Sequence, residues 1–231
     1  VTSIARQTRH LQRWNTLHSN VIDRIQFGLA LYISAISIHK NKIKALGLKI
    51  LEKEIKENIQ PDGSIIGCNP SEMLEIFRKL TILSKLNEQS ANIDKKLISS
   101  ATNKIGDAIN VLRHSDEKLT VFNGSHEEEN EYINSIFLSS QNKLTHKKIP
   151  ASLPYAGFER LSSRRILIIA KSGTGAGSFQ SRLGPLGFEL SVGKERLIVN
   201  CGTFIGEDDE WKKATLNNSA YSTITIEDSN P

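Results

Sequence analysis

The stretch LGPLGFELSVGKERLIVNCGT, residues 183–203, decides the fold of the second part of this chain. It holds two runs rich in Phe, Leu, Val and Ile, which are LGFELSV and ERLIVNCG, separated by the turn Val192-Gly193-Lys194. Short apolar runs on either side of a glycine-containing turn are typical of paired β-strands. The stretch therefore predicts a β-hairpin.

Similar short runs lie before and after this hairpin. They are FERLS (158–162), RRILIIAKS (164–172) and YSTITIED (221–228). With the hairpin they predict an antiparallel sheet over residues 155–231. A β-sandwich usually has about seven strands or more, so this number of strands indicates the start of such a domain.

The first two thirds of the chain show helical periodicity, because apolar residues recur three and four positions apart. We predict four helices from this pattern: one carrying the stripe Ile22 to Ile36, one over 43–55, one beginning at Ser71 and one over 97–112. Their apolar faces are wide, as expected when helix pairs pack on neighbours to both sides. The pattern favours a layered helical array over a coiled coil.

The helical pattern breaks in the polar run NGSHEEENEY (123–132) and again in KLTHKKIPASLP (143–154). Prolines, clustered charges and lost periodicity are typical of a boundary between domains. We predict a helical part over residues 1–138, a linker over 139–154 and a β-domain over 155–231.

Composition excludes several classes of protein. With 38% hydrophobic and 24% charged residues, the chain resembles a globular protein rather than a disordered one. Its most apolar stretch, Phe27–Ile38, is too short to cross a bilayer, and the first residues show no signal peptide. Cys68 and Cys201 are far apart, which argues against a disulfide framework or a zinc site. The net charge of +5 mildly favours anionic partners, although it also serves solubility.

Several strings, in the same order along the chain, resemble the heparinase II/III-like family, in particular its alphaproteobacterial members. The strings are RQTRHLQRW (6–14), PDGSIIGCNPSEMLEIFRKL (61–80), RHSDEKLTVFNG (113–124), the hairpin quoted above and AYSTITIED (220–228). The hairpin, with its FELS and IVNCG segments, is the most specific of them. Together these strings cover most of the chain.

The resemblance implies an α+β multidomain fold, in which an incomplete α/α toroid is followed by the start of an antiparallel β-sandwich. It also implies β-elimination on a uronic-acid-containing polysaccharide. That reaction needs a group that neutralises the carboxylate, a base that takes the C5 proton and an acid for the leaving oxygen.

The resemblance gives candidates for these roles. The candidate catalytic residues are Tyr221, His114 and Asn69. The candidate substrate-binding residues are Arg182, Arg113, Asn123, Trp211 and Glu189.

The chain departs from the family at positions that matter for chemistry. Family histidines fall on Ile65, Arg182 and Tyr221, an arginine falls on Cys68, and an aspartate falls on Lys171. Arginine stays protonated and cannot replace an imidazole as a metal ligand or proton shuttle. We therefore expect no cofactor in this chain, although the complete family fold can hold a metal ion. Two hypotheses remain: a lyase with relocated chemistry, or a degenerate homologue that keeps glycan binding or only a structural role.

Each candidate also has a simpler interpretation. Asn69-Pro70 and Asn123-Gly124 are common turn sequences, and Arg113-His114 follow a helix whose exposed carbonyls favour cations. Glu189 could lie on the solvent face of its strand.

We expect an acidic polysaccharide or oligosaccharide as partner, and neither nucleic acid nor a membrane span. Nucleic-acid binding would rest on net charge alone, since aromatic residues make up only 6% of the chain. The family implies a place in the cell envelope or periplasm, while the missing signal peptide leaves the cytoplasm open. The sequence leaves the oligomeric state undecided.

Overall fold

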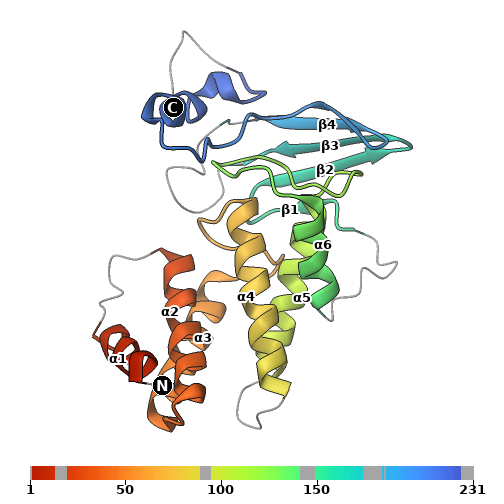
Figure 1. Ribbon diagram of the computed structural model, residues 1–231. Coiled ribbons are helices and arrows are strands. Elements are labelled where there is room, and N and C mark those ends of the chain that lie inside the picture. The colour runs from red at the N-terminus through yellow and green to blue at the C-terminus, as the bar shows by residue number, and fades with distance from the viewer. Residues whose placement is uncertain are drawn as a thin grey trace.

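The computed structural model describes residues 2–13, 20–88, 95–140, 149–173, 184 and 186–224. In these residues the helical part comes first and an antiparallel sheet follows it (Figure 1). The helices are α1 (Thr2–Leu11), α2 (Val21–Ser37), α3 (Asn41–Asn58), α4 (Pro70–Glu88), α5 (Lys95–Val111) and α6 (Asn130–Ser139). The strands are β1 (Ser152–Leu153), β2 (Phe158–Ser163), β3 (Ile166–Lys171), β4 (Phe188–Val192) and β5 (Glu195–Ile198), followed by α7 (Asp209–Thr215) and the 3-10 turn Asn218–Ala220.

The apolar periodicity predicted α2, α3 and α5 to within three residues at each end, and it predicted the beginning of α4 to within one residue. Helices α2 and α3 pack closely because each has a glycine at the contact. A Cβ on Gly47 would lie 2.8 Å from the Gly28 carbonyl oxygen and 2.8 Å from the Tyr32 nitrogen. The absence of side chains at these two positions lets the backbones approach.

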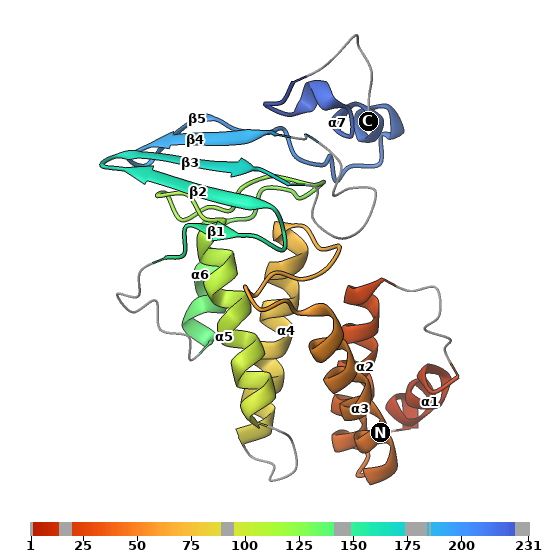
Figure 2. The ribbon, with the colours of Figure 1, turned by 180° about the vertical axis from the view of Figure 1, so that it is seen from behind.

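The sheet covers one end of the helices, as both views show (Figures 1 and 2). Its strands follow one another in chain order, and each pairs antiparallel with the next. The predicted hairpin is present, since β4 and β5 are joined through Gly193 at φ +60°.

The inner face of the sheet belongs to the same core as the helices. Leu167 and Ile169 of β3 lie in one buried cluster with residues of α2, α4 and α5. Phe158 of β2 packs edge-on against Phe122, with ring centroids 5.3 Å apart. The helical part and the sheet therefore share a continuous apolar contact.

The outer face of the sheet is apolar and partly exposed. Ile168 pairs with Leu161 on one side and with Leu190 on the other, which places these three side chains on that face. Leu161 is 58% exposed, and Leu197 of β5 is 62% exposed. This face resembles the inner layer of a sandwich whose second sheet is not among the described residues.

Three local predictions differ from the structure. The predicted strand YSTITIED is wrong over residues 221–224, which form no strand, and its remaining residues lie outside the described part. Ser222 instead bonds to the start of β4, where its carbonyl accepts from the Phe188 nitrogen at 3.3 Å. Strand β1 lies within residues 139–154, and α7 forms in a segment without helical periodicity. Helix α6 ends at Ser139 and β1 begins at Ser152, so the predicted division into domains stays a prediction.

Within the described residues, no helix is long and apolar enough to span a membrane.

Candidate functional site

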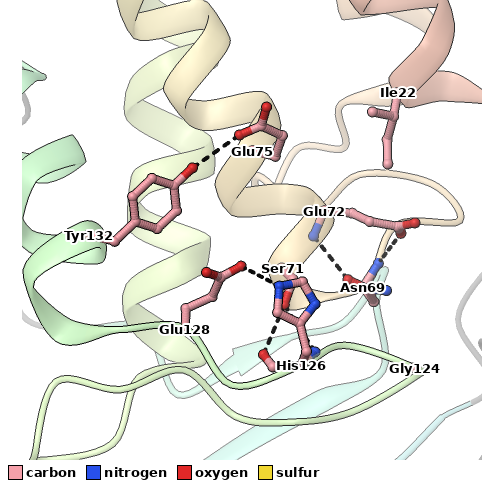
Figure 3. Close-up of a pocket in the computed structure, with 9 residues that line it drawn as sticks. All are labelled: Ile22, Asn69, Ser71, Glu72, Glu75, Gly124, His126, Glu128 and Tyr132. Atoms are coloured by element: carbon pink, nitrogen blue, oxygen red, sulfur yellow. Dashed lines mark hydrogen bonds and ion pairs between the residues drawn. The ribbon is translucent and has the colours of Figure 1, made fainter. Parts of the chain in front are cut away.

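A pocket of about 430 Å³ opens between the helical part and the loop that precedes α6 (Figure 3). Its lining comes from four segments that are distant in sequence, namely the start of α2, the start of α4, the loop 124–128 and α6. The lining residues are Ile22, Asn69, Ser71, Glu72, Glu75, Gly124, His126, Glu128 and Tyr132.

Asn69 enters this pocket as the residue that caps α4. Its Oδ1 accepts from the Glu72 nitrogen at 2.9 Å, and the Glu72 Oε2 accepts in return from the Asn69 nitrogen at 2.8 Å. Such a reciprocal pair satisfies two backbone donors that the helix leaves free, and Pro70 suits the first helical position. The capping bonds use the amide oxygen, so the amide NH₂ remains the group that Asn69 can offer to a ligand.

The predicted start of α4 at Ser71 is one residue late, because α4 begins at Pro70 and Asn69 is its cap. Ser71 lies in the first turn, and its hydroxyl bonds to the backbone of His126 instead, donating to the carbonyl at 3.1 Å and accepting from the nitrogen at 3.2 Å. This contact holds the loop 124–128 against α4. The pKa of Glu72 is raised because the carboxyl is buried, although its bond from the Asn69 backbone acts in the opposite direction.

Two further side chains complete the polar wall of the pocket. The Nε2 of His126 lies 2.8 Å from the Oε1 of Glu128, and the Tyr132 hydroxyl donates to the Oε2 of Glu75 at 3.2 Å (Figure 3). Burial, followed by the nearby Glu75 charge, raises the pKa of Tyr132. The phenol therefore keeps its proton at neutral pH.

Glu75 stays ionised. Its pKa is lowered to about 2, chiefly by the hydrogen bond from Arg78 and then by Lys79, although partial burial acts in the opposite direction. The Arg78 Nη2 lies 2.6 Å from its Oε1, and the Lys79 Nζ lies 2.7 Å from the same atom. A carboxylate held this way accepts the Tyr132 proton in a hydrogen bond but is too weak a base to remove it.

A second polar cluster is buried between the helical part and the sheet. Its centre is Glu189 of β4, whose side chain is 0% exposed. The Oε2 of Glu189 lies 2.9 Å from the His114 Nε2, and its Oε1 accepts from the Val121 nitrogen at 2.8 Å and from the Asn200 Nδ2 at 3.1 Å. The Nδ1 of His114 lies 3.0 Å from the Oγ of Ser191. The expectation that Glu189 could face solvent is therefore wrong.

Lys171 makes a further hydrogen bond across the same interface. Its ammonium donates to the Asn123 Oδ1 at 2.7 Å, and burial lowers its pKa to about 8. Asn123 has φ +55° and Gly124 has φ +78°, so this bond holds an unusual backbone turn directly before His126. The two buried clusters thus fix the loop that carries one wall of the pocket.

Tyr221 lies at the edge of this interface. Its ring contacts Gly184, where an added Cβ would come within 2.9 Å of it. Burial raises the pKa of its hydroxyl, and the neighbouring Gly124 backbone lowers it by less. Tyr221 is not among the residues that line the pocket, and its hydroxyl lies next to the Gly124 backbone of the pocket loop.

The structure brings together only some of the residues predicted for the site. Asn69 lines the pocket, whereas His114, Glu189 and Asn123 lie in the buried clusters behind its loop. Arg113 is buried as well, and its guanidinium donates to the Glu117 carbonyl at 2.9 Å and to Asn134 at 2.9 Å.

The two remaining candidates lie elsewhere. Trp211 of α7 is 60% exposed and lies 6.3 Å from Phe204, measured between ring centroids. Arg182 lies outside the described residues. The roles assigned to all these residues stay predictions.

His126 and Tyr132 were missed by the sequence analysis. Both fall in the run NGSHEEENEY, whose charge suggested a solvated boundary. A signal was present, since the run holds an imidazole and a phenol six residues apart, but nothing local showed that they line the same pocket as Asn69.

Among the described residues, those at the family's altered positions do not form a metal site. Ile65 is part of the apolar core, Lys171 carries an ammonium, and burial raises the pKa of the Cys68 thiol. In the part of the chain that is described, no three His, Cys, Asp or Glu side chains gather closely enough to hold a metal ion. The described side chains at these positions therefore do not fit a metal ion.

Comparisons with known proteins agree with this architecture. Residues 145–231 match the family model described as heparinase II/III-like, C-terminal. No curated protein is similar enough in sequence to count as a match.

Three solved structures have the same fold as the chain. A heparinase III superposes with a TM-score of 0.76 at 14% identity, covering 99% of this chain and 42% of that one. The heparan sulfate lyase of Pedobacter heparinus gives 0.70 at 17% identity, covering 99% and 40%. A heparinase III gene product with methylated lysines gives 0.74 at 14% identity, covering 98% and 39%. The chain thus spans about two fifths of the length of these structures.

Proposed function

We propose that this chain is part of a polysaccharide lyase-type protein, because residues 145–231 match the heparinase II/III-like family model and the chain superposes on a heparinase III. Its proposed substrate is a uronic-acid-containing polysaccharide, cleaved by β-elimination. The observation that supports this is the pocket, which gathers an amide, an imidazole and a phenol from separate segments. A location in the cell envelope or periplasm is part of the proposal.

Asn69 is the proposed carboxylate-binding group. Its capping oxygen is held by the Glu72 nitrogen, which leaves the amide NH₂ to donate to the uronate. A hydrogen bond to the carboxylate stabilises the negative charge that develops when the C5 proton leaves.

His126 and Tyr132 supply the proton transfers in this proposal. With its Nε2 hydrogen directed at Glu128, the imidazole keeps the Nδ1 lone pair free to take the C5 proton. The C4–O bond breaks, a C4=C5 double bond forms, and the Tyr132 hydroxyl protonates the leaving oxygen. Tyr132 suits the role of acid because its raised pKa keeps it protonated.

His114 and Tyr221 have a different place in this proposal. Both are buried behind the pocket loop, so they position His126 and Gly124 rather than contact the sugar.

One observation favours the second candidate function, glycan binding without chemistry. Three glutamates, Glu72, Glu75 and Glu128, line the pocket and repel a uronate. In that case the pocket would bind a sugar through hydrogen bonds alone, and no double bond would form.

The test is the ultraviolet absorbance of the conjugated C4=C5 double bond, followed while the protein is incubated with several acidic polysaccharides. Tyr132→Phe removes the proposed acid, and we expect it to lower the rate at least about 100-fold. Tyr155→Phe is the matched control, because Tyr155 is 51% exposed and does not line the pocket. A rate equal in the two variants would contradict the role of Tyr132, and a flat trace with the folded wild type would favour binding without chemistry.

A further inference from the structure

Positive charge is concentrated at the beginning of this chain. Residues 1–56 hold ten lysines and arginines but only three acidic residues, although the whole chain has 30 of the former and 25 of the latter. The remainder of the chain is therefore slightly acidic. Helices α1 to α3, which carry this charge, lie together on one side of the molecule (Figures 1 and 2).

Four lysines of α3 form a single stripe. They lie seven, eleven and fourteen positions after the first, and at 100° per residue all four point within about 40° of one direction. The stripe consists of Lys42, Lys49, Lys53 and Lys56, and all four are exposed. It runs for about 21 Å along the helix.

This lysine stripe lies opposite the packed face of α3. The buried residues of the helix include Gly47, Leu51 and Ile55, which point toward α2 and the core. The stripe therefore faces solvent, and its last lysine lies in the last turn of α3, at the sheet end of the helix (Figure 2).

A merely solvated face would alternate the signs of its charges along the helix. Here the positions between the lysines on the stripe are Ala45 and Leu46, and the nearest acidic residues, Glu52 and Glu57, lie on its two flanks. The neighbouring Glu57 is only loosely paired with Lys53, at 3.9 Å. Like charges about 10 Å apart or less repel one another at physiological salt, so the stripe is best neutralised by a polyanion.

We propose that the lysine stripe of α3 is a docking surface for an acidic polysaccharide, separate from the pocket at Asn69. A linear polyanion lying along α3 meets successive ammonium groups without bending. No aromatic side chain lies on the stripe to stack on a base, which disfavours single-stranded nucleic acid. The choice of a glycan rests on the proposed function, whereas the presence of the docking surface does not.

The experiment replaces the whole stripe by glutamine. The test variant is Lys42→Gln, Lys49→Gln, Lys53→Gln and Lys56→Gln combined. The matched control carries the same loss of charge at four other exposed lysines, as Lys96→Gln, Lys104→Gln, Lys194→Gln and Lys213→Gln. Circular dichroism and thermal unfolding check that both remain folded.

Dissociation constants are measured by calorimetry for heparin, for neutral dextran and for single-stranded DNA, at low and at high salt. We expect heparin binding to weaken about tenfold or more in the stripe variant and about twofold or less in the control. Equal weakening in both variants would overturn the docking surface, as would undiminished binding in the stripe variant. If the wild type bound DNA more tightly than heparin, and the stripe variant lost this DNA binding, a glycan would not be the ligand of the stripe.

The same measurements separate this inference from the proposed function. Tyr132→Phe should lose cleavage and keep its affinity for heparin, because Tyr132 lies in the pocket and not on α3. If cleavage proves absent in every variant while the stripe variant alone loses affinity, the docking surface stands without the lyase.

Discussion

Replacement of Glu189 should strongly lower the free energy of unfolding of this protein. Its carboxylate is fully buried and meets donors on three segments, which are His114 after α5, the Val121 nitrogen and the Asn200 side chain. The Asn200 backbone nitrogen approaches the same carboxylate at 3.3 Å. In Glu189→Ala all of these donors lose their acceptor within the interface between the helices and the sheet.

The magnitude follows from the number of groups left without partners. Each buried donor without an acceptor costs about 1–3 kcal/mol, and breaking a buried charge pair costs about 3–5 kcal/mol in total. We expect Glu189→Ala to lower the free energy of unfolding by about 3–5 kcal/mol. For a chain of this length that corresponds to a fall in Tm of roughly 6–20 °C.

Glu189→Gln should cost less, about 1–2 kcal/mol. Its amide oxygen can still accept from Val121 and Asn200, while its NH₂ faces His114, which can change tautomer and donate to Ser191 instead. The ordering of the two variants therefore depends on the geometry around the carboxylate and not on burial alone.

The assay is urea denaturation followed by circular dichroism, with Glu195→Ala as the control. Glu195 lies exposed on β5, so its replacement should change stability by less than about 0.5 kcal/mol. A Glu189→Ala protein as stable as this control would refute the assignment of Glu189 to the buried interface.

Other consequences can be measured on the same chain. Folding lowers the pKa of Lys171 from 10.5 to about 8, so between these pH values the folded protein binds fewer protons than the unfolded chain. The free energy of unfolding should therefore rise with pH over this range. Lys171→Met should lose this rise, which urea titrations at pH 8 and 10.5 would measure. Glu75, whose pKa is lowered to about 2 chiefly by Arg78, should make the wild type lose stability as pH falls from 4.5 toward 2, and Glu75→Gln should lose less over this range in acid titrations. Gly63 has φ +86°, and a Cβ added there would lie 2.0 Å from the Lys104 carbonyl oxygen of α5. A Cβ added at Gly193 would lie 3.0 Å from the flexible Arg165 side chain, so Gly63→Ala should lower Tm clearly more than Gly193→Ala. Equal Tm values for the two variants would contradict this packing.

The helices and the hairpin could be predicted from the sequence because their signals are local. Apolar spacing determines which face of α2 to α5 packs, and Gly193 between two apolar runs marks the turn. The start of α4 was harder, because both Asn69 and Ser71 can cap a helix. Asn69 is the cap because the Glu72 side chain reaches back and accepts a hydrogen bond from the Asn69 nitrogen.

The site could be predicted only in part. Asn69 was found through its motif, but its companions come from a polar run that carries no periodic signal. The burial of Glu189 could not be predicted either, because a strand has two faces and a carboxylate usually lies on the solvent-exposed one. Only the tertiary contact with His114 makes the inward face favourable for it.

The most direct test of the account compares cleavage by the wild type and by Asn69→Asp, using the ultraviolet absorbance of the new double bond. Aspartate caps helices as well as asparagine, so α4 should stay intact while the NH₂ donor becomes a carboxylate oxygen that repels the uronate. We expect product from the wild type and at least about a 100-fold slower rate from the folded variant. Equal rates from the two proteins would contradict the claim that the pocket at Asn69 is where the polysaccharide reacts.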